Sequence, residues 1–112
     1  MKLLHIGDVV GAAGSRFLQE RLPNIKRTHK IDMTVVNGEN SAQGNGITKH
    51  SMEQIFSAGA DVITTGNHCF KRREALAIYD NPVVLRPANY PEGCVGPVSY
   101  THLRAHETCA DL

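Results

Sequence analysis

Short apolar runs recur along the chain and are separated by longer stretches with helical spacing. The runs Leu3 to Ile6, Met33 to Val36, Val62 to Thr65 and Val83 to Leu85 are each bounded on at least one side by Gly, Asp, Asn or Pro. Runs of this length, rich in β-branched residues and flanked by turn formers, are typical of short strands, and we expect the first to be buried.

A long helix is predicted between the first two strands. Leu18, Leu22 and Ile25 fall at i, i+4 and i+7, which places them on one face of a helix. Pro23 lies within this stretch. Because proline removes a backbone donor and clashes with the preceding turn, we expect it to kink or restart the helix.

Two shorter helices are predicted further along the chain. Thr48 or Ser51 is a suitable N-cap for the second helix, and Gly59 supplies a left-handed C-cap. Residues 72–79 are predicted to form the third helix. The apolar face of the second helix comprises Met52, Ile55 and Phe56.

The resulting order is β-α-β-α-β-α-β. Alternation of short strands with helices implies parallel pairing through crossover connections. We therefore predict an α/β layered fold with a largely parallel sheet.

Charge and composition exclude several classes of protein. Twelve Lys and Arg stand against eleven Asp and Glu, a net charge of +1, so the chain lacks the basic field that stable DNA binding requires. No apolar run approaches the roughly 20 residues that span a bilayer, and no signal peptide is evident, so we expect no membrane association and a cytoplasmic location. The three cysteines show no paired spacing, which argues against a disulfide framework.

Polar side chains follow each of the first three predicted strands. Asp8 follows the first, Glu39 and Asn40 the second, and Asn67 and His68 the third. Because parallel strands end at one edge of a sheet, these residues are expected to line one crevice. Asp, Glu and Asn supply oxygen ligands for divalent cations, and a histidine can bind metal or transfer a proton. Taken one at a time, the Asp and Asn residues are better explained as turn formers, but their coincidence at three strand ends favours a site.

These strand ends belong to a set of motifs that resembles a known family. The segments are Ile6–Gly11, Val36–Asn40, Gly44–Thr48, Thr65–His68 and Leu85–Pro91. In order and spacing they resemble the YmdB-like branch of the calcineurin-like metallophosphoesterases, over residues 1 to about 96. Several ordered motifs are far more specific than a single glycine pattern. The resemblance implies that the chain forms the N-terminal half of the layered metallophosphoesterase fold.

The resemblance also implies a role for each strand-end residue. Asp8 would bind one metal, Glu39 would bridge two, Asn40 would assist at the first and Asn67 would bind the second, with His68 as proton donor. The cofactors would be two divalent metal ions, iron or manganese, that activate water to attack phosphorus. The expected substrates are phosphodiesters such as 2',3'-cyclic nucleotides.

The chain departs from the family in two respects. Val10 occupies a position that is histidine in the wider superfamily, a departure typical of the YmdB-like branch. Family members are also much longer and supply further metal-binding histidines from their C-terminal half. Because those ligands are missing, we expect this chain by itself to be inactive or impaired.

The end of the chain is expected to differ from the rest. Residues 1–97 are predicted to be the N-terminal part of a metallophosphoesterase domain, and residues 98–112 an atypical tail. That tail resembles translated adapter or vector sequence, and we predict that it is not native. His102, His106 and Cys109 have a spacing that could serve zinc, but no second ligand pair frames them.

Two alternatives to the enzyme remain open at the level of sequence. One is a nucleotide-binding or regulatory module that uses the same crevice without hydrolysis. The other is a non-functional fragment, because half a sheet exposes an edge and an apolar face. The oligomeric state is open as well, and a homo-oligomer is compatible with the sequence.

Overall fold

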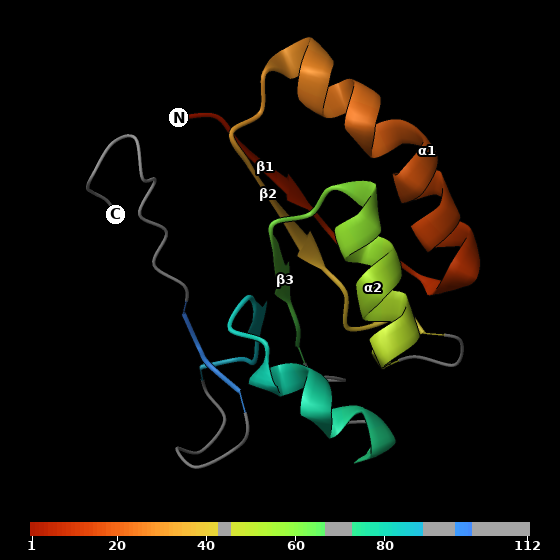
Figure 1. Cartoon of the computed structure of the whole chain (residues 1–112), viewed down its shortest axis with the longest axis vertical. Helices are drawn as coiled ribbons and strands as arrows, with labels where there is room; N and C mark the ends of the chain where they lie inside the picture. The colour runs from red at the N-terminus through yellow and green to blue at the C-terminus, as the bar shows by residue number, and fades with distance from the viewer. Residues whose placement is uncertain (43–45, 67–72, 89–95, 100–112) are drawn as a thin grey trace.

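The computed structural model describes residues 1–42, 46–66, 73–88 and 96–99 of the chain. Its elements follow one another in the predicted alternation of strands and helices (Figure 1). They are β1 (Leu3–Ile6), α1 (Gly11–His29), β2 (Met33–Asn37), α2 (Lys49–Ala58), β3 (Val62–Thr64), the 3₁₀ helix η1 (Arg73–Asp80) and β4 (Val84–Leu85).

The strands form one parallel sheet in the order β1-β2-β3-β4. Leu3 pairs with Met33 in the first ladder, and Ile63 pairs with Val36 on one side and with Val84 on the other. Each strand therefore lies beside the one that follows it in the chain, as short crossover connections favour. The predicted α/β fold class with a parallel sheet is confirmed.

Helix α1 runs without interruption through Pro23. The expected restart is therefore wrong, and the reason is that Pro23 lies on the exposed side of the helix, where water can satisfy the carbonyl that loses its donor. Ser15, Leu18 and Leu22 form the buried face. Ile25 is 37% exposed and so lies at the margin of this face rather than within it.

Helix α2 begins with a capping box. The Thr48 side chain accepts a hydrogen bond from the Ser51 backbone N–H at 3.1 Å, and the Thr48 N–H donates to the Ser51 hydroxyl at 2.9 Å. Both residues expected as alternative caps thus act together. Gly59 is the C-cap of this helix, as predicted, but its φ of 123° and ψ of 13° lie outside the left-handed helical conformation that was expected. Glycine adopts this positive φ readily, because it has no β-carbon.

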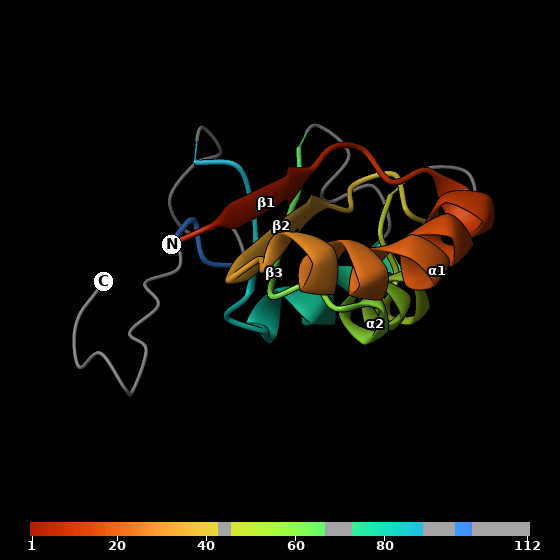
Figure 2. The same ribbon diagram turned by 90° about the horizontal axis from the view of Figure 1, so that it is seen from above.

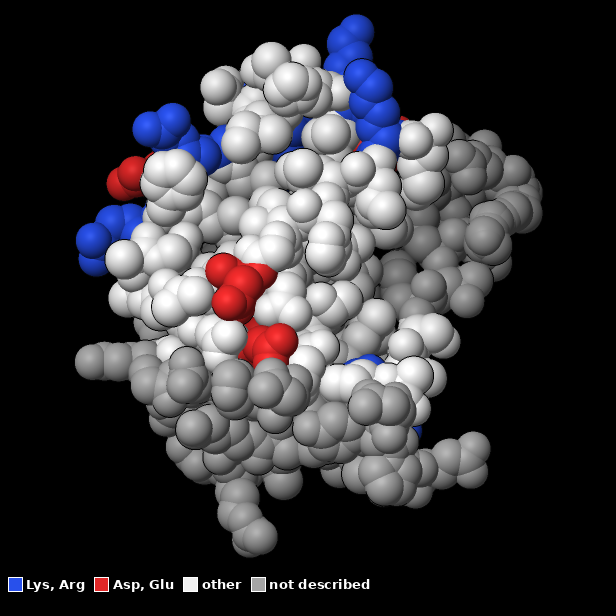
Figure 3. All heavy atoms as spheres, turned by 180° about the vertical axis from the view of Figure 1, so that it is seen from behind, with Lys and Arg blue, Asp and Glu red and all other residues white. Residues whose placement is uncertain are grey.

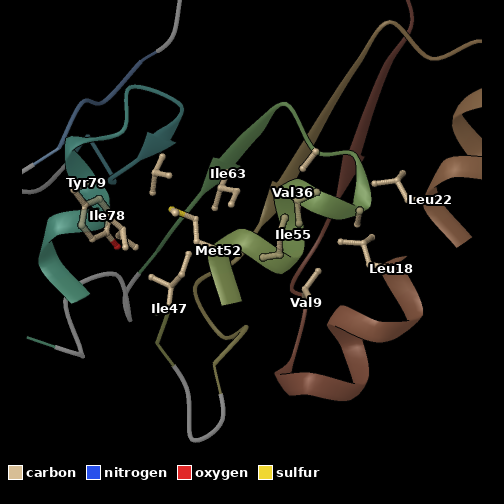
Figure 4. Close-up of a cluster of buried hydrophobic side chains, with 13 residues drawn as sticks. Val9, Leu18, Leu22, Val36, Ile47, Met52, Ile55, Ile63, Ile78 and Tyr79 are labelled. Atoms are coloured by element: carbon tan, nitrogen blue, oxygen red, sulfur yellow. The ribbon is translucent and has the colours of Figure 1, made fainter. Parts of the chain in front are cut away.

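The helices α1, α2 and η1 lie on the same side of the sheet (Figures 1 and 2). Their apolar side chains meet alternate residues of the strands, because successive strand residues point to opposite faces. Figure 4 shows this core between α1, α2 and the sheet. Its fully buried large apolar side chains are Leu22, Val36, Ile47, Ile55, Ile63 and Val84.

The expectation that residues 3–6 form a buried strand is wrong. Leu3 is 59% exposed and His5 is exposed, whereas Leu4 and Ile6 are partly buried against the core. The cause is that Leu3 and His5 point to the face of the sheet opposite the helices, which none of the described elements covers (Figure 2). Only the side facing the helices is covered.

Later elements differ slightly from their predicted form. The third helix is a 3₁₀ helix over Arg73–Asp80 rather than an α-helix. Strands β3 and β4 are each one residue shorter than expected. Among the described residues, none of the helices combines the length and hydrophobicity needed to span a bilayer.

Candidate metal centre

The residues that follow the first three strands lie at one edge of the sheet. Asp8 lies two residues beyond β1, Glu39 two residues beyond β2 and Gly66 two residues beyond β3. Because the strands are parallel and in register, these positions are neighbours across the loops. This edge is where open α/β sheets bind their ligands.

Asp8 and Asn40 are in direct contact at this edge. The Asn40 side-chain Nδ2 donates to Asp8 Oδ1 at 2.9 Å. Two backbone bonds hold the same loops together, from the Val9 N–H to the Asn37 carbonyl at 3.2 Å and from the Gly11 N–H to the Asn40 carbonyl at 3.0 Å. The relative position of the Asp8 carboxylate and the Asn40 amide is therefore fixed by three hydrogen bonds.

Glu39 reaches from the end of β2 toward the end of β3. Its Oε1 accepts a hydrogen bond from Asn37 Nδ2 at 3.3 Å, and its backbone N–H donates to Asn37 Oδ1 at the same distance. A β-carbon built on Gly66 would lie 2.7 Å from Cδ of Glu39 and 2.8 Å from Oε2. The carboxylate thus occupies the space that a side chain at residue 66 would need.

The oxygen atoms gathered here fit a hard divalent cation. Asp8 and Glu39 contribute carboxylates, and Oδ1 of Asn40 is buried without a hydrogen-bond partner among the described residues. A buried carbonyl oxygen without a donor carries a free-energy cost that coordination to a cation removes. The described part of the chain contains no group of three or more His, Cys, Asp or Glu side chains that could hold a metal. The described donor set consists of the two carboxylates and the Asn40 amide oxygen.

The surface charge is consistent with a cation site. Figure 3 shows the side of the molecule opposite the helices, where two groups of acidic atoms adjoin among described residues that carry no charge. The Lys and Arg atoms in this view lie mainly at its margin. Within the described part of the chain these acidic groups are set apart from basic ones, an arrangement that attracts cations.

The remaining predicted site residues cannot be placed in the same way. Asn67 and His68 lie outside the described residues, although they directly follow Gly66 in the sequence. The three residues considered for zinc, His102, His106 and Cys109, also lie outside. The assignments of ligands and proton donor therefore stay predictions.

Two residues that shape the site were missed by the sequence reasoning. Asn37 holds the Glu39 carboxylate, and Gly66 leaves room for it. The Asn-x-Glu spacing offered a signal for the first, because Asn side chains commonly bond to the backbone two residues on. The signal for Gly66 was weaker, since it depends on a contact between loops far apart in sequence.

Fold and site together define a class, α/β proteins with an oxygen-rich site at the carboxyl ends of parallel strands. Residues 4–109 match the family described as YmdB-like protein, and the chain belongs to this family. The match includes part of the tail from Val98, and the prediction that this tail is not native stays a prediction, as does the boundary at residue 97.

The relatives include proteins with a named activity. A Bacillus subtilis (strain 168) protein named 2',3'-cyclic-nucleotide 2'-phosphodiesterase is 40% identical over 107 residues, which cover 95% of this chain and 40% of that protein. The chain therefore spans about 40% of the length of this curated relative.

Two solved structures share the fold. A hypothetical protein from Thermus thermophilus has a TM-score of 0.84 at 35% identity, over 91% of this chain and 40% of that one. A structure described as a novel phosphatase from Mycoplasma pneumoniae has a TM-score of 0.83 at 27% identity, over 91% of this chain and 38% of that one.

Proposed function

We propose that the complete protein carrying this chain is a metal-dependent phosphodiesterase that hydrolyses small phosphodiesters such as 2',3'-cyclic nucleotides. The observation that carries the proposal is the contact of Asn40 with Asp8 at the edge of the sheet where the Glu39 carboxylate also lies. The activity named for the Bacillus subtilis relative supports the choice of substrate.

The proposed site holds two divalent cations, iron or manganese. Asp8 and Asn40 would hold the first, Asn67 the second, and Glu39 would reach both. When bound, such a pair supplies Lewis acidity, which makes water a nucleophile near neutral pH and stabilises the negative charge that develops on phosphorus. His68 is proposed to deliver a proton to the leaving oxygen.

Hydrogen bonds within the chain prepare the two carboxylates for this task. Asn40 Nδ2 occupies one oxygen of Asp8, which leaves the other oxygen to face a cation. Asn37 orients the Glu39 carboxylate in the same manner. Such supporting bonds reduce the freedom of each ligand before a metal arrives.

The 112 residues alone are expected to turn over substrate poorly. Their described part offers two carboxylates for two proposed cations, whereas catalytic metals ordinarily take at least three protein ligands each. The cytoplasmic location and the oligomeric state stay predictions.

Alanine substitution of the proposed ligands tests the function. Asp8→Ala, Glu39→Ala and Asn67→Ala in the complete protein are each expected to lower turnover of 2',3'-cyclic AMP by at least about 100-fold, because each removes a direct ligand. Glu20→Ala is the control, since Glu20 is an exposed carboxylate on α1. Wild-type turnover in the three ligand variants would refute the proposal. Nucleotide binding without any product would instead favour the non-catalytic module.

A further inference from the structure

An open pocket of about 540 Å³ lies between the first turn of α1 and the first turns of α2. Ala12 lines it from α1, and Thr48, His50 and Gln54 line it from the cap and body of α2. Its volume falls within the range of small-molecule sites, roughly 300 to 1,000 Å³. The pocket is therefore large enough for a nucleoside.

Two of the residues that line the pocket connect it with Asn40 of the candidate metal centre. Ser41, which lines the pocket, directly follows Asn40. Ala12, on the opposite wall, directly follows Gly11, whose N–H donates to the Asn40 carbonyl at 3.0 Å. The pocket therefore borders the loop that carries Asn40, one of the proposed metal ligands.

The inner end of the pocket is rigid. Ser41 is 2% exposed and Ser51 is 3% exposed. The Ser41 hydroxyl donates to the Gly38 carbonyl at 2.7 Å, and the two hydroxyl oxygens lie 2.9 Å apart. Because these groups satisfy one another, they form a fixed polar end rather than an adaptable one.

The α2 wall carries polar groups that have no partner. His50 is exposed and Gln54 is partly buried, and neither side chain forms a hydrogen bond within the described part of the chain. They lie at i and i+4, on one face of the helix. A carboxamide offers a donor and an acceptor together, and an imidazole adds an aromatic ring with a second polar edge.

None of the described residues that line the pocket is Lys, Arg, Asp or Glu. An anion or a metal ion would find no fixed charge of opposite sign there. A neutral heterocycle with several donors and acceptors is matched by the Gln54 carboxamide and the His50 imidazole. This is the chemistry of a nucleobase and its ribose.

We propose that this pocket binds the nucleoside part of the substrate and so sets the preference for nucleotides over simple phosphodiesters. The inference rests on the proposed function for the role of the bound ligand. Its two specificity residues are His50 and Gln54, which touch the nucleoside and not the phosphate. The chemistry at phosphorus is left to the residues of the metal centre.

Kinetics with two substrates tests the pocket. In the complete protein, His50→Ala and Gln54→Ala are each expected to raise KM for 2',3'-cyclic AMP by about 5- to 10-fold, the effect of one lost hydrogen bond, with little change in kcat. Neither should alter KM for bis(p-nitrophenyl) phosphate, which has no nucleoside. Glu53→Ala is the matched control, because Glu53 is exposed on the same helix and does not line the pocket. Unchanged KM for the nucleotide, or equal changes for both substrates, would overturn the inference.

A binding measurement separates this inference from the proposed function. Adenosine, which lacks phosphate, is titrated into the metal-free complete protein by calorimetry or NMR. Saturable binding that His50→Ala and Gln54→Ala weaken, and Glu53→Ala does not, would support the pocket even if no hydrolysis were found. Absence of adenosine binding, or equal binding by all variants, would overturn the pocket and leave the phosphodiesterase proposal standing.

Discussion

At the scale of single residues, Gly66 determines where the Glu39 carboxylate lies. Any β-carbon at this position would overlap with that carboxylate. Asp8 is held differently, through the amide of Asn40. The site therefore depends on one residue that provides space and on others that provide hydrogen bonds.

Substitution of Gly66 by Ala is expected to weaken metal binding. The added methyl group displaces the Glu39 carboxylate, and such changes next to a ligand typically lower metal affinity by about 10-fold or more. Calorimetric titration of Mn²⁺ into the complete protein measures the effect.

Gly7→Ala is the matched control for this experiment. A β-carbon at Gly7 meets no atom of the described residues within 4 Å, and the φ of Gly7 is not positive. We expect its Mn²⁺ affinity to match the wild type. Equal affinity in the Gly66→Ala variant would contradict the role assigned to Gly66.

The proposed metal ligands were predictable from the sequence, whereas the residues that only position those ligands were harder to find. Asp8, Glu39 and Asn40 lie within four residues after apolar runs, and because parallel strands end at one edge of a sheet, the sequence alone predicts that they lie together. The contact of Gly66 with Glu39 joins loops 27 positions apart, and no local pattern encodes such a contact.

At the scale of elements, the two α-helices differ in the local features that affect their stability. Helix α1 tolerates an internal proline, whereas α2 relies on a paired cap. Their contact includes a hydrogen bond from Lys26 Nζ to the Gly59 carbonyl at 2.7 Å. The proline in α1 and the capping of α2 therefore both affect the stability of the core between them.

Replacement of Pro23 by Ala is expected to stabilise the protein. Pro inside a helix costs about 3 kcal/mol, and the entropy that Pro removes from the unfolded chain offsets part of this. A net gain of about 1 to 2 kcal/mol is expected in the free energy of unfolding, measured with urea. Glu20→Ala on the same helix should stay within about 0.5 kcal/mol of the wild type. A loss of stability on replacing Pro23 would show that the helix needs the proline.

Removal of the α2 capping box is expected to destabilise the protein. Ser51→Ala deletes the hydroxyl that accepts from the Thr48 N–H and contacts Ser41. The free energy of unfolding should fall by about 1 to 2 kcal/mol in urea titrations. Ser57→Ala, at an exposed position of the same helix, should have almost no effect. Equal stability of the two variants would contradict the importance of the cap.

At the scale of the whole molecule, the structure is a parallel sheet covered by helices on one side (Figure 2). The order of strands was predictable, because successive strands joined by helices pair with their neighbours. The exposure of β1 could not be predicted. The sequence LLHI is as apolar as a central strand, and the burial of its side chains depends on what packs against the far face of the sheet. The pattern of residues 72–79 likewise predicted a helix but not its 3₁₀ form.

The central claim is that the strand-end carboxylates serve a metal-dependent phosphodiesterase, and metal add-back tests it most directly. The complete protein is stripped with a chelator, and hydrolysis of 2',3'-cyclic AMP is followed while Mn²⁺ is titrated back. The account predicts no turnover without metal, saturable recovery in the wild type, and no recovery in Glu39→Gln. Turnover by the metal-free protein, or recovery of Glu39→Gln to the wild-type rate, would contradict it.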